Sequence, residues 1–155
     1  MTVQQPGHRH RHRLPFTPDG RHERVVGRGL DFTRAVLADQ LPDAAQVGVG
    51  DVLLVVAELL SNAVQHADGP TALEIRLDTP GGQEAAAVRV EVSDTSTVRP
   101  HPRTPRPDEP GGRGLRIVER TSTAWGSEAA PGGKTVWADL RLPTPVGGGH
   151  ASHGV

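Results

Sequence analysis

A single carboxylate interrupts an apolar run near the middle of the chain. Glu58 follows Val52–Ala57 and precedes Leu59–Leu60. The pattern predicts a helix that is buried on most of its sides. Because an unpartnered carboxylate is rarely buried and is costly in apolar surroundings, the sequence predicts either a paired arginine or a pocket that holds a ligand and water.

Glu58, Asn62 and His66 are spaced four residues apart, so they form a polar stripe along one side of that helix. Three polar groups stacked over two turns beside an apolar face would make the wall of a binding pocket. The same spacing is typical of the polar edge of an amphipathic helix at a domain surface, so both interpretations stay open. The apolar face beside the stripe is formed by Val52, Val55, Val56, Leu59 and Ala63.

Two other features could contribute to such a pocket. Asp94 continues the alternation of Val88–Val92, so its carboxylate is expected on the same side of a strand as those valines, unless it caps the following turn. Gly111–Gly114 (Gly-Gly-Arg-Gly) precedes an apolar helix, and backbone N–H groups at a helix start suit phosphate. Gly133–Thr135 is not a Walker loop, because Glu128 stands where that pattern requires glycine.

The elements that must position these residues follow from apolar spacing and turn signals. Their order is helix, helix, strand, strand, helix, strand, strand, and the first two strands are predicted to form a hairpin. We therefore expect an α+β fold, a two-layer sandwich with the helices on one face of a mostly antiparallel sheet. The expected helices cover residues 23–41, 47–67 and 114–123, and the expected strands lie near 73–77, 88–92, 124–130 and 134–142.

The length of 155 residues suits one such domain, expected over residues 14–142, with a tail at each end. Residues 1–13 end in alternating histidine and arginine, and residues 143–155 are rich in glycine, proline and histidine. Both tails are predicted to be disordered. A histidine-rich tract can bind transition metals, although a disordered tail would give such a site no fixed geometry.

Charge and cysteine content exclude several classes of protein. The formal net charge of -1 gives no electrostatic argument for binding nucleic acid or an anionic membrane. The absence of cysteine excludes disulfides, thiolate zinc sites and a cysteine nucleophile. Because no signal segment and no apolar stretch of about 18–20 residues is apparent, we expect a cytoplasmic protein that binds no membrane.

The polar features together resemble the motifs of the GHKL ATPase/kinase superfamily. Glu58–His66 (Glu-Leu-Leu-Ser-Asn-Ala-Val-Gln-His) is similar to its N box, Asp94 stands where its G1 box starts, and Gly112–Leu115 lies where its G2 box is expected. Within the superfamily, the chain resembles the small bacterial anti-sigma factor serine kinases and the related stand-alone histidine kinase-like ATP-binding regulators. The resemblance covers about residues 23–142.

The resemblance implies a Bergerat fold that binds ATP and Mg²⁺ between the helical layer and a lid over residues 99–110. Glu58 would be the catalytic base that orients or deprotonates an attacking hydroxyl group, and Asn62 would hold Mg²⁺. Asp94 would accept a hydrogen bond from the adenine amino group, and the backbone of Gly112–Gly114 would contact phosphates. The full set of expected nucleotide-binding residues is Asn62, His66, Asp94, Ser96, Gly112, Arg113, Gly114, Leu115 and Thr135.

The function implied by the resemblance is that of an anti-sigma factor kinase, which phosphorylates a small antagonist protein and sequesters a sigma factor; a homodimer is left open. Asp94–Val98 lacks the glycines of the usual G1 box, and glycine lets a backbone approach a nucleotide closely. A non-catalytic ATP-binding switch that binds a protein partner is therefore the alternative. A third, purely structural interpretation pairs Glu58 with an arginine such as Arg34 or Arg116.

Overall fold

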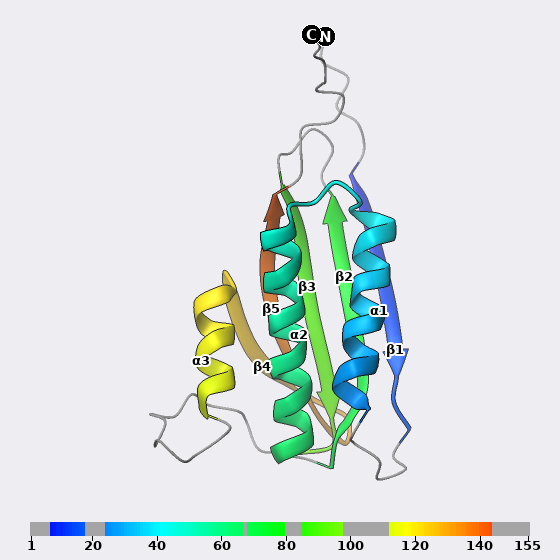
Figure 1. Ribbon diagram of the computed structural model, residues 1–155. Helices are drawn as coiled ribbons and strands as arrows, with labels where there is room; N and C mark the ends of the chain where they lie inside the picture. The colour runs from blue at the N-terminus through cyan, green and yellow to red at the C-terminus, as the bar shows by residue number, and fades with distance from the viewer. Residues whose placement is uncertain (1–6, 18–23, 67, 80–84, 98–111, 144–155) are drawn as a thin grey trace, which may run out of the picture.

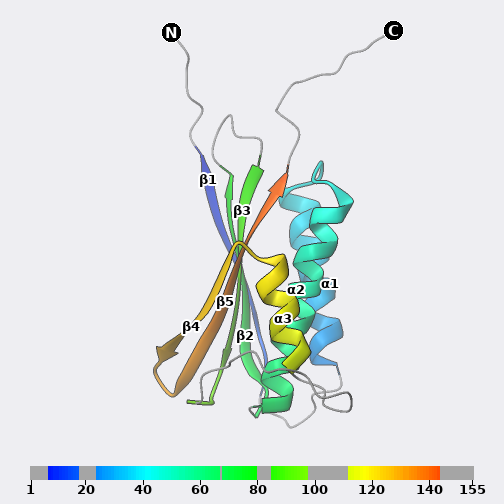
Figure 2. The ribbon, with the colours of Figure 1, turned by 90° about the vertical axis from the view of Figure 1, so that its left-hand side faces the viewer.

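Three helices cover one face of a five-stranded sheet in the computed structural model, counted over the residues that it describes (Figure 1). These residues are 7–17, 24–66, 68–79, 85–97 and 112–143. Figure 2 shows the sheet nearly edge-on, with the three helices on the same side of it. The predicted class, an α+β two-layer sandwich, is confirmed.

The helices begin and end close to their predicted positions. α1 spans Val25–Gln40, α2 spans Gln46–His66 and α3 spans Gly112–Thr121. The N–H group of Leu41 closes the end of α1 by donating to the Leu37 carbonyl oxygen over 2.8 Å, and the proline that follows cannot continue the helix. α2 lies in the middle of the helical layer, between α1 and α3 (Figure 1).

The strands form one antiparallel sheet. In chain order they are β1 His8–Pro15, β2 Pro70–Thr79, β3 Ala85–Asp94, β4 Ala124–Ala130 and β5 Gly133–Pro143. Their order across the sheet is β1-β2-β3-β5-β4, so β3 is central and β1 and β4 are the edges. The predicted hairpin of the first two expected strands is confirmed as the β2–β3 pair, and the last two expected strands pair as β4 and β5.

β1 corrects the prediction of a disordered tail over residues 1–13. Residues 8–13 belong to this strand, which pairs along its whole length with β2. An edge strand is held by backbone hydrogen bonds and needs few apolar side chains, and an ion pair of 2.6 Å joins Arg11 to Glu74 of β2. Residues 1–6 of this tail, and the C-terminal tail beyond Pro143, lie outside the described residues.

α2 supplies much of the core. The side chains of Val52, Val55 and Val56, on the face predicted to be apolar, are fully buried. Contrary to the expectation above, Gln46–Gln65 is long and apolar enough by length and composition to cross a membrane. A helix in the core of a protein passes the same test, and the packing of α2 on β3, β5 and both other helices accounts for its apolar composition.

Candidate functional site

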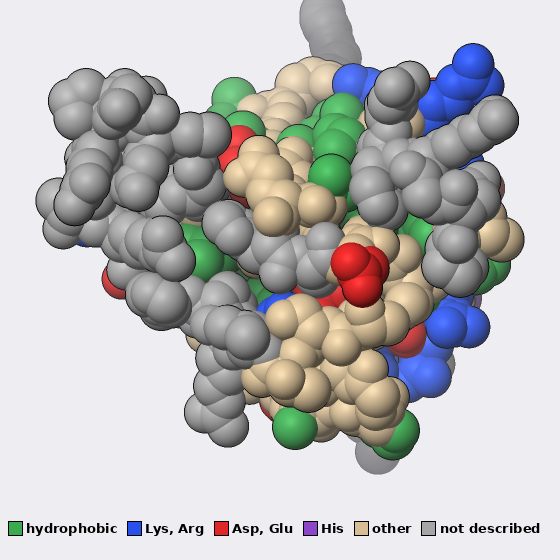
Figure 3. Space-filling view, turned by 90° about the horizontal axis from the view of Figure 1, so that it is seen from below, with side chains coloured by type: hydrophobic (Ala, Val, Ile, Leu, Met, Phe, Trp, Pro, Cys, Tyr) green, Lys and Arg blue, Asp and Glu red, His purple; other side chains and the backbone are tan. Residues whose placement is uncertain are grey.

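The polar residues singled out in the sequence come from elements that meet at one end of the molecule. The second half of α2, the end of β3, the start of β5 and the start of α3 lie at the lower end of Figure 1, and Figure 2 shows the same grouping. Figure 3 looks onto this end, where acidic side chains reach the surface near its centre. Glu58 and Asn62 belong to α2, and Asp94 is the last residue of β3.

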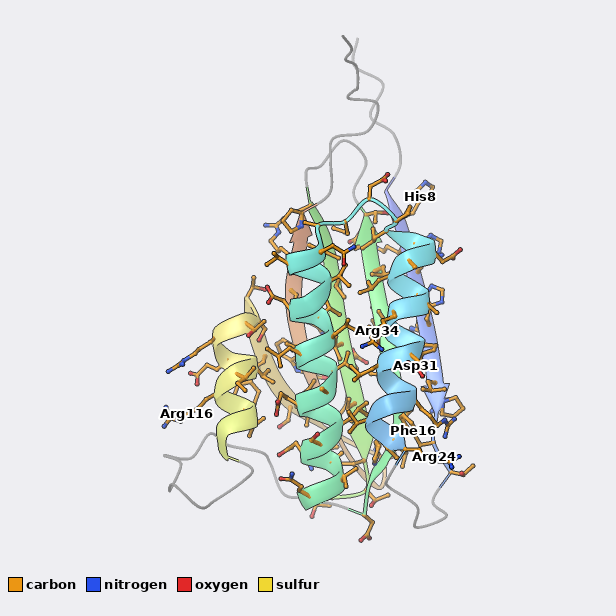
Figure 4. The ribbon with its side chains drawn as sticks, in the orientation of Figure 1. His8, Phe16, Arg24, Asp31, Arg34 and Arg116 are labelled. Carbon is orange, nitrogen blue, oxygen red and sulfur yellow. The ribbon has the colours of Figure 1, made fainter. Side chains whose placement is uncertain are left out.

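Glu58 is partly buried on the flank of α2 and forms no ion pair with a described residue. Arg34 pairs instead with Asp31 of its own helix, at 3.3 Å. Arg116 points away from α2, on the far side of α3 (Figure 4). Burial raises the pKa of the Glu58 carboxyl, because desolvation disfavours its charged form. The arginine pair of the structural interpretation therefore does not form among the described residues.

Glu58→Gln is expected to stabilise the fold at pH 7. Because burial raises the pKa of the folded-state carboxyl, keeping Glu58 charged destabilises the folded protein at any pH above that pKa. As the pH falls through this raised pKa, the wild-type carboxyl takes up a proton, and its destabilising effect on the folded state is lost. The stability difference between variant and wild type should therefore shrink, and vanish below the ordinary value of 4.5. Denaturant unfolding at a series of pH values measures this difference.

Glu119→Gln is the matched control for this prediction, because Glu119 is exposed on α3. Its effect on the free energy of unfolding should stay within about 0.5 kcal/mol at every pH, as for most surface substitutions. A Glu58→Gln variant that is less stable than wild type at pH 7 contradicts the prediction.

Asp94 and Lys134 form a buried ion pair where β3 ends and β5 begins. The Lys134 Nζ donates to Asp94 Oδ1 over 3.0 Å, and the two side chains are 6% and 1% exposed. The backbone N–H of Ser96 donates to the same oxygen over 2.8 Å. Both interpretations of Asp94 therefore hold, since its carboxylate points inward and also caps the turn.

The second carboxylate oxygen of Asp94 is not used by the ion pair or by the turn. Oδ2 is buried and has no hydrogen-bond partner among the described residues. A buried acceptor without a partner costs about 1–3 kcal/mol, so native proteins seldom leave one unsatisfied. We interpret Oδ2 as an acceptor that receives a hydrogen bond from a donor group of a ligand.

Lys134 and Gly133 are site residues that the sequence reasoning missed. The strand register places Lys134 directly opposite Asp94, and a Cβ atom on Gly133 would lie 1.9 Å from the Asp94 carbonyl oxygen. Only glycine therefore allows the two strands to approach this closely. Two signals could have found Lys134: it is the chain's only lysine, and it shares strand parity with the apolar Val136.

Thr135 lies on the opposite face of the sheet, which corrects its expected place at the adenine end. Its hydroxyl is hydrogen-bonded to Ser93 Oγ at 2.9 Å on the face away from the helices, because alternate residues of a strand point to opposite faces. Leu115 is buried, with 4% of its surface exposed. Ser96 is partly buried and reaches Asp94 through its backbone N–H.

Gly112–Gly114 form the first turn of α3 and not a loop before it. α3 begins at Gly112, two residues earlier than expected. The first N–H groups of a helix have no partner within it, and the positive end of the helix dipole lies there. Phosphate binding by Gly112–Gly114 stays a prediction, as does the role of His66. The side chains of His66 and Arg113, and the expected lid over residues 99–110, lie outside the described residues.

This donor and acceptor set fits a magnesium nucleotide. Asn62 is partly buried one helical turn from Glu58, and its amide oxygen is a hard ligand of the kind that Mg²⁺ takes. The unpartnered Asp94 Oδ2 can accept a hydrogen bond from an exocyclic amine of a base. The N-terminal turn of α3 suits phosphate. Base, metal ion and phosphates would thus each meet a suitable group at this end of the domain.

The fold and this site together define a nucleotide-binding domain with one helical layer and one sheet. The sequence model of the histidine kinase-like ATPase domain matches residues 20–140. The chain belongs to this family, which confirms the resemblance to the GHKL superfamily and implies that the domain binds ATP.

A solved structure supports the same fold. The chain is similar to the crystal structure of the RsbU and RsbW domains of Rv1364c from Mycobacterium tuberculosis, with a TM-score of 0.59 and 21% sequence identity. The match covers 86% of this chain and 33% of that chain, and at this identity it supports the fold alone. A comparison with curated proteins found no match.

Proposed function

We propose that this protein is an ATP- and Mg²⁺-dependent serine/threonine protein kinase of the anti-sigma factor type. Its family supports an ATP-using regulator, and the resemblance of residues 23–142 to the small bacterial anti-sigma factor serine kinases favours that type within it. The observation that carries the catalytic part is Glu58 itself. Its carboxylate is partly buried, its pKa is raised by burial, and it has no ion-pair partner among the described residues.

Glu58 and Asn62 have complementary tasks in this proposal. When bound, ATP supplies the phosphoryl group and Mg²⁺ neutralises charge on its phosphates. Asn62 holds the metal ion through its amide oxygen. Glu58 orients the attacking hydroxyl group of the partner protein and accepts its proton, and its raised pKa makes it a stronger base than an exposed carboxylate.

Asp94 and the start of α3 position the nucleotide. Asp94 Oδ2 accepts a hydrogen bond from the adenine amino group, while Lys134 holds the other carboxylate oxygen in place. The backbone N–H groups of Gly112–Gly114 donate to phosphate oxygens at the positive end of the α3 dipole. Phosphoryl transfer depends mainly on such positioning and on charge stabilisation.

The partners in this proposal are two proteins. A small antagonist protein receives the phosphoryl group on a serine or threonine, and a sigma factor is sequestered when the antagonist is modified. In this proposal the protein acts in the cytoplasm and contacts neither nucleic acid nor a membrane directly, and a homodimer stays open.

A non-catalytic ATP-binding switch is the second candidate function. It is favoured by the segment Asp94–Val98, which contains no glycine. A side chain at every position of this segment restricts the approach of the backbone to a nucleotide. The switch would bind its protein partner in an ATP-dependent way without transferring phosphate.

Incubation with γ-labelled ATP, Mg²⁺ and candidate antagonist proteins distinguishes the two functions. For the kinase, we expect label on a serine or threonine, and Glu58→Gln should reduce its transfer by about 10²–10⁴-fold, the usual contribution of a general base. ATP affinity measured by calorimetry should change little in this variant. The exposed control Glu119→Gln should transfer label like wild type.

The other outcomes are equally informative. Saturable ATP binding without transfer to any tested protein supports the switch. The absence of binding at millimolar ATP in the presence of Mg²⁺ contradicts both functions.

A further inference from the structure

Three histidines share one face of β1. His8, His10 and His12 occupy alternate positions of this strand and therefore point to the same side. They lie on the side of the helices, because the β2 residues opposite His10 and His12 belong to the buried core. The residues of β2 opposite the three histidines are Thr79, Leu77 and Ile75. Figure 4 shows β1 beside α1, with His8 at its upper end.

The arginines that alternate with these histidines lie on the outer face. Arg9 pairs with Asp78 at 3.4 Å and Arg11 with Glu74 at 2.6 Å. The strand therefore keeps its permanent positive charges on one face, where two of its three arginines pair with a carboxylate. The imidazoles are left together on the other face, where those guanidinium groups do not intervene.

The spacing of the imidazoles is close to that of a chelate. The ring centroids are 6.2 Å apart for His8 and His10, and 6.4 Å apart for His10 and His12. Two imidazoles that bind one ion at about 2.0–2.1 Å have centroids about 5 Å apart in tetrahedral geometry. Side-chain rotation can close this difference, since His8 and His10 are exposed. His12 Nε2 has no hydrogen-bond partner among the described residues, so no hydrogen bond has to be broken, but the ring must turn outward before this buried nitrogen can bind an ion.

We propose that β1 is a binding site for a divalent metal cation that prefers imidazole ligands, such as Zn²⁺. His10 and one of its neighbours, His8 or His12, would supply two imidazole nitrogens. Imidazole suits Zn²⁺, Cu²⁺ and Ni²⁺ but not Mg²⁺. No group of three or more potential ligands converges on a metal site among the described residues, so water completes the coordination shell.

This site would make the stability of β1, at the edge of the sheet, depend on the bound metal. A metal that binds the ordered strand better than the unfolded chain stabilises the strand by mass action. The site lies on β1 and is independent of the proposed kinase function, whose residues belong to α2, α3, β3 and β5.

The test uses the full chain and Zn²⁺ alone, titrated by calorimetry at pH 7.5, with Mg²⁺ as the comparison. The matched variant exchanges two neighbours, Arg9→His with His10→Arg, so composition and charge are unchanged while the shared ligand moves to the outer face. We expect Zn²⁺ affinity to fall about tenfold or more, because the second imidazole no longer binds intramolecularly. We also expect Zn²⁺ to raise the Tm of wild type and not that of the exchange variant. The histidines outside the strand are His22, His66, His101, His150 and His153, and they are identical in both proteins.

Two outcomes overturn the proposal. The first is an exchange variant that binds Zn²⁺ like wild type, as a disordered histidine tract would. The second is a wild-type Tm that Zn²⁺ does not raise. Among the described residues, the exchange breaks the exposed Arg9–Asp78 ion pair, which is worth little, and the ring contacts of His10 with His8 and His12. Should it nevertheless unfold the chain, His10→Gln removes the shared ligand while leaving Arg9 in place, and the same loss of affinity is required of it.

Discussion

Lys134→Met is expected to lower the free energy of unfolding by about 3–5 kcal/mol, because it leaves the Asp94 carboxylate buried without its counter-charge. The side chains of Lys134 and Asp94 are 6% and 1% exposed, so water cannot replace the lost ammonium group. The pair joins the central strand β3 to its neighbour β5, and the loss should therefore appear in the global transition. Denaturant unfolding followed by circular dichroism measures it.

The double variant Lys134→Met with Asp94→Leu is the control. It should recover most of the lost stability, since apolar residues of similar volume can replace a buried ion pair with little loss. A double-mutant cycle then separates the pair from the effect of the methionine itself. A single variant within about 1 kcal/mol of wild type, the effect of an ordinary substitution, contradicts a buried ion pair at this position.

The elements that bury apolar side chains were predictable from the sequence. α2 and the β2–β3 hairpin follow from apolar periodicity and turn signals, because each must turn an apolar face toward the core. β1 was missed because its residues carry no such pattern. Its six N-terminal residues alternate histidine and arginine, and the strand is held by backbone pairing with β2 and by ion pairs such as Arg11–Glu74. These interactions depend on a partner far along the chain.

The residues of the candidate site also fall into two groups, those that the sequence alone reveals and those that only the fold reveals. Glu58, Asn62 and Asp94 could be singled out because a polar residue stands out against an apolar pattern on its own helix or strand. Lys134 could not be assigned to Asp94 without the register between β3 and β5, which joins residues forty positions apart. The same register puts Thr135 on the outer face. Sequence reasoning therefore finds the acidic groups, whereas their partners require the fold.

On the proposed function, ATP is expected to bind about 10- to 100-fold more tightly than inosine triphosphate, the range expected when a hydrogen bond to a charged group is lost. Asp94 Oδ2 is a buried acceptor without a partner among the described residues, and Asp94 Oδ1 already receives Lys134 Nζ and the N–H of Ser96. Adenine brings a donor at its position 6. Hypoxanthine brings an oxygen there, which would face the carboxylate and leave it unsatisfied. Calorimetric titration of the protein with each nucleotide and Mg²⁺ measures the two affinities.

Thr135→Ala is the control that distinguishes a nucleotide contact with the Asp94 carboxylate from a contact with the outer face of the sheet. Because the Thr135 hydroxyl is bonded to Ser93 on the outer face, the variant should keep both affinities and their ratio. A loss of ATP binding in Thr135→Ala would show that the nucleotide reaches the outer face and would refute the assignment of Asp94. Equal affinities of the wild-type protein for ATP and inosine triphosphate would refute it as well, since a buried carboxylate oxygen that meets the base at position 6 cannot treat a donor and an acceptor alike.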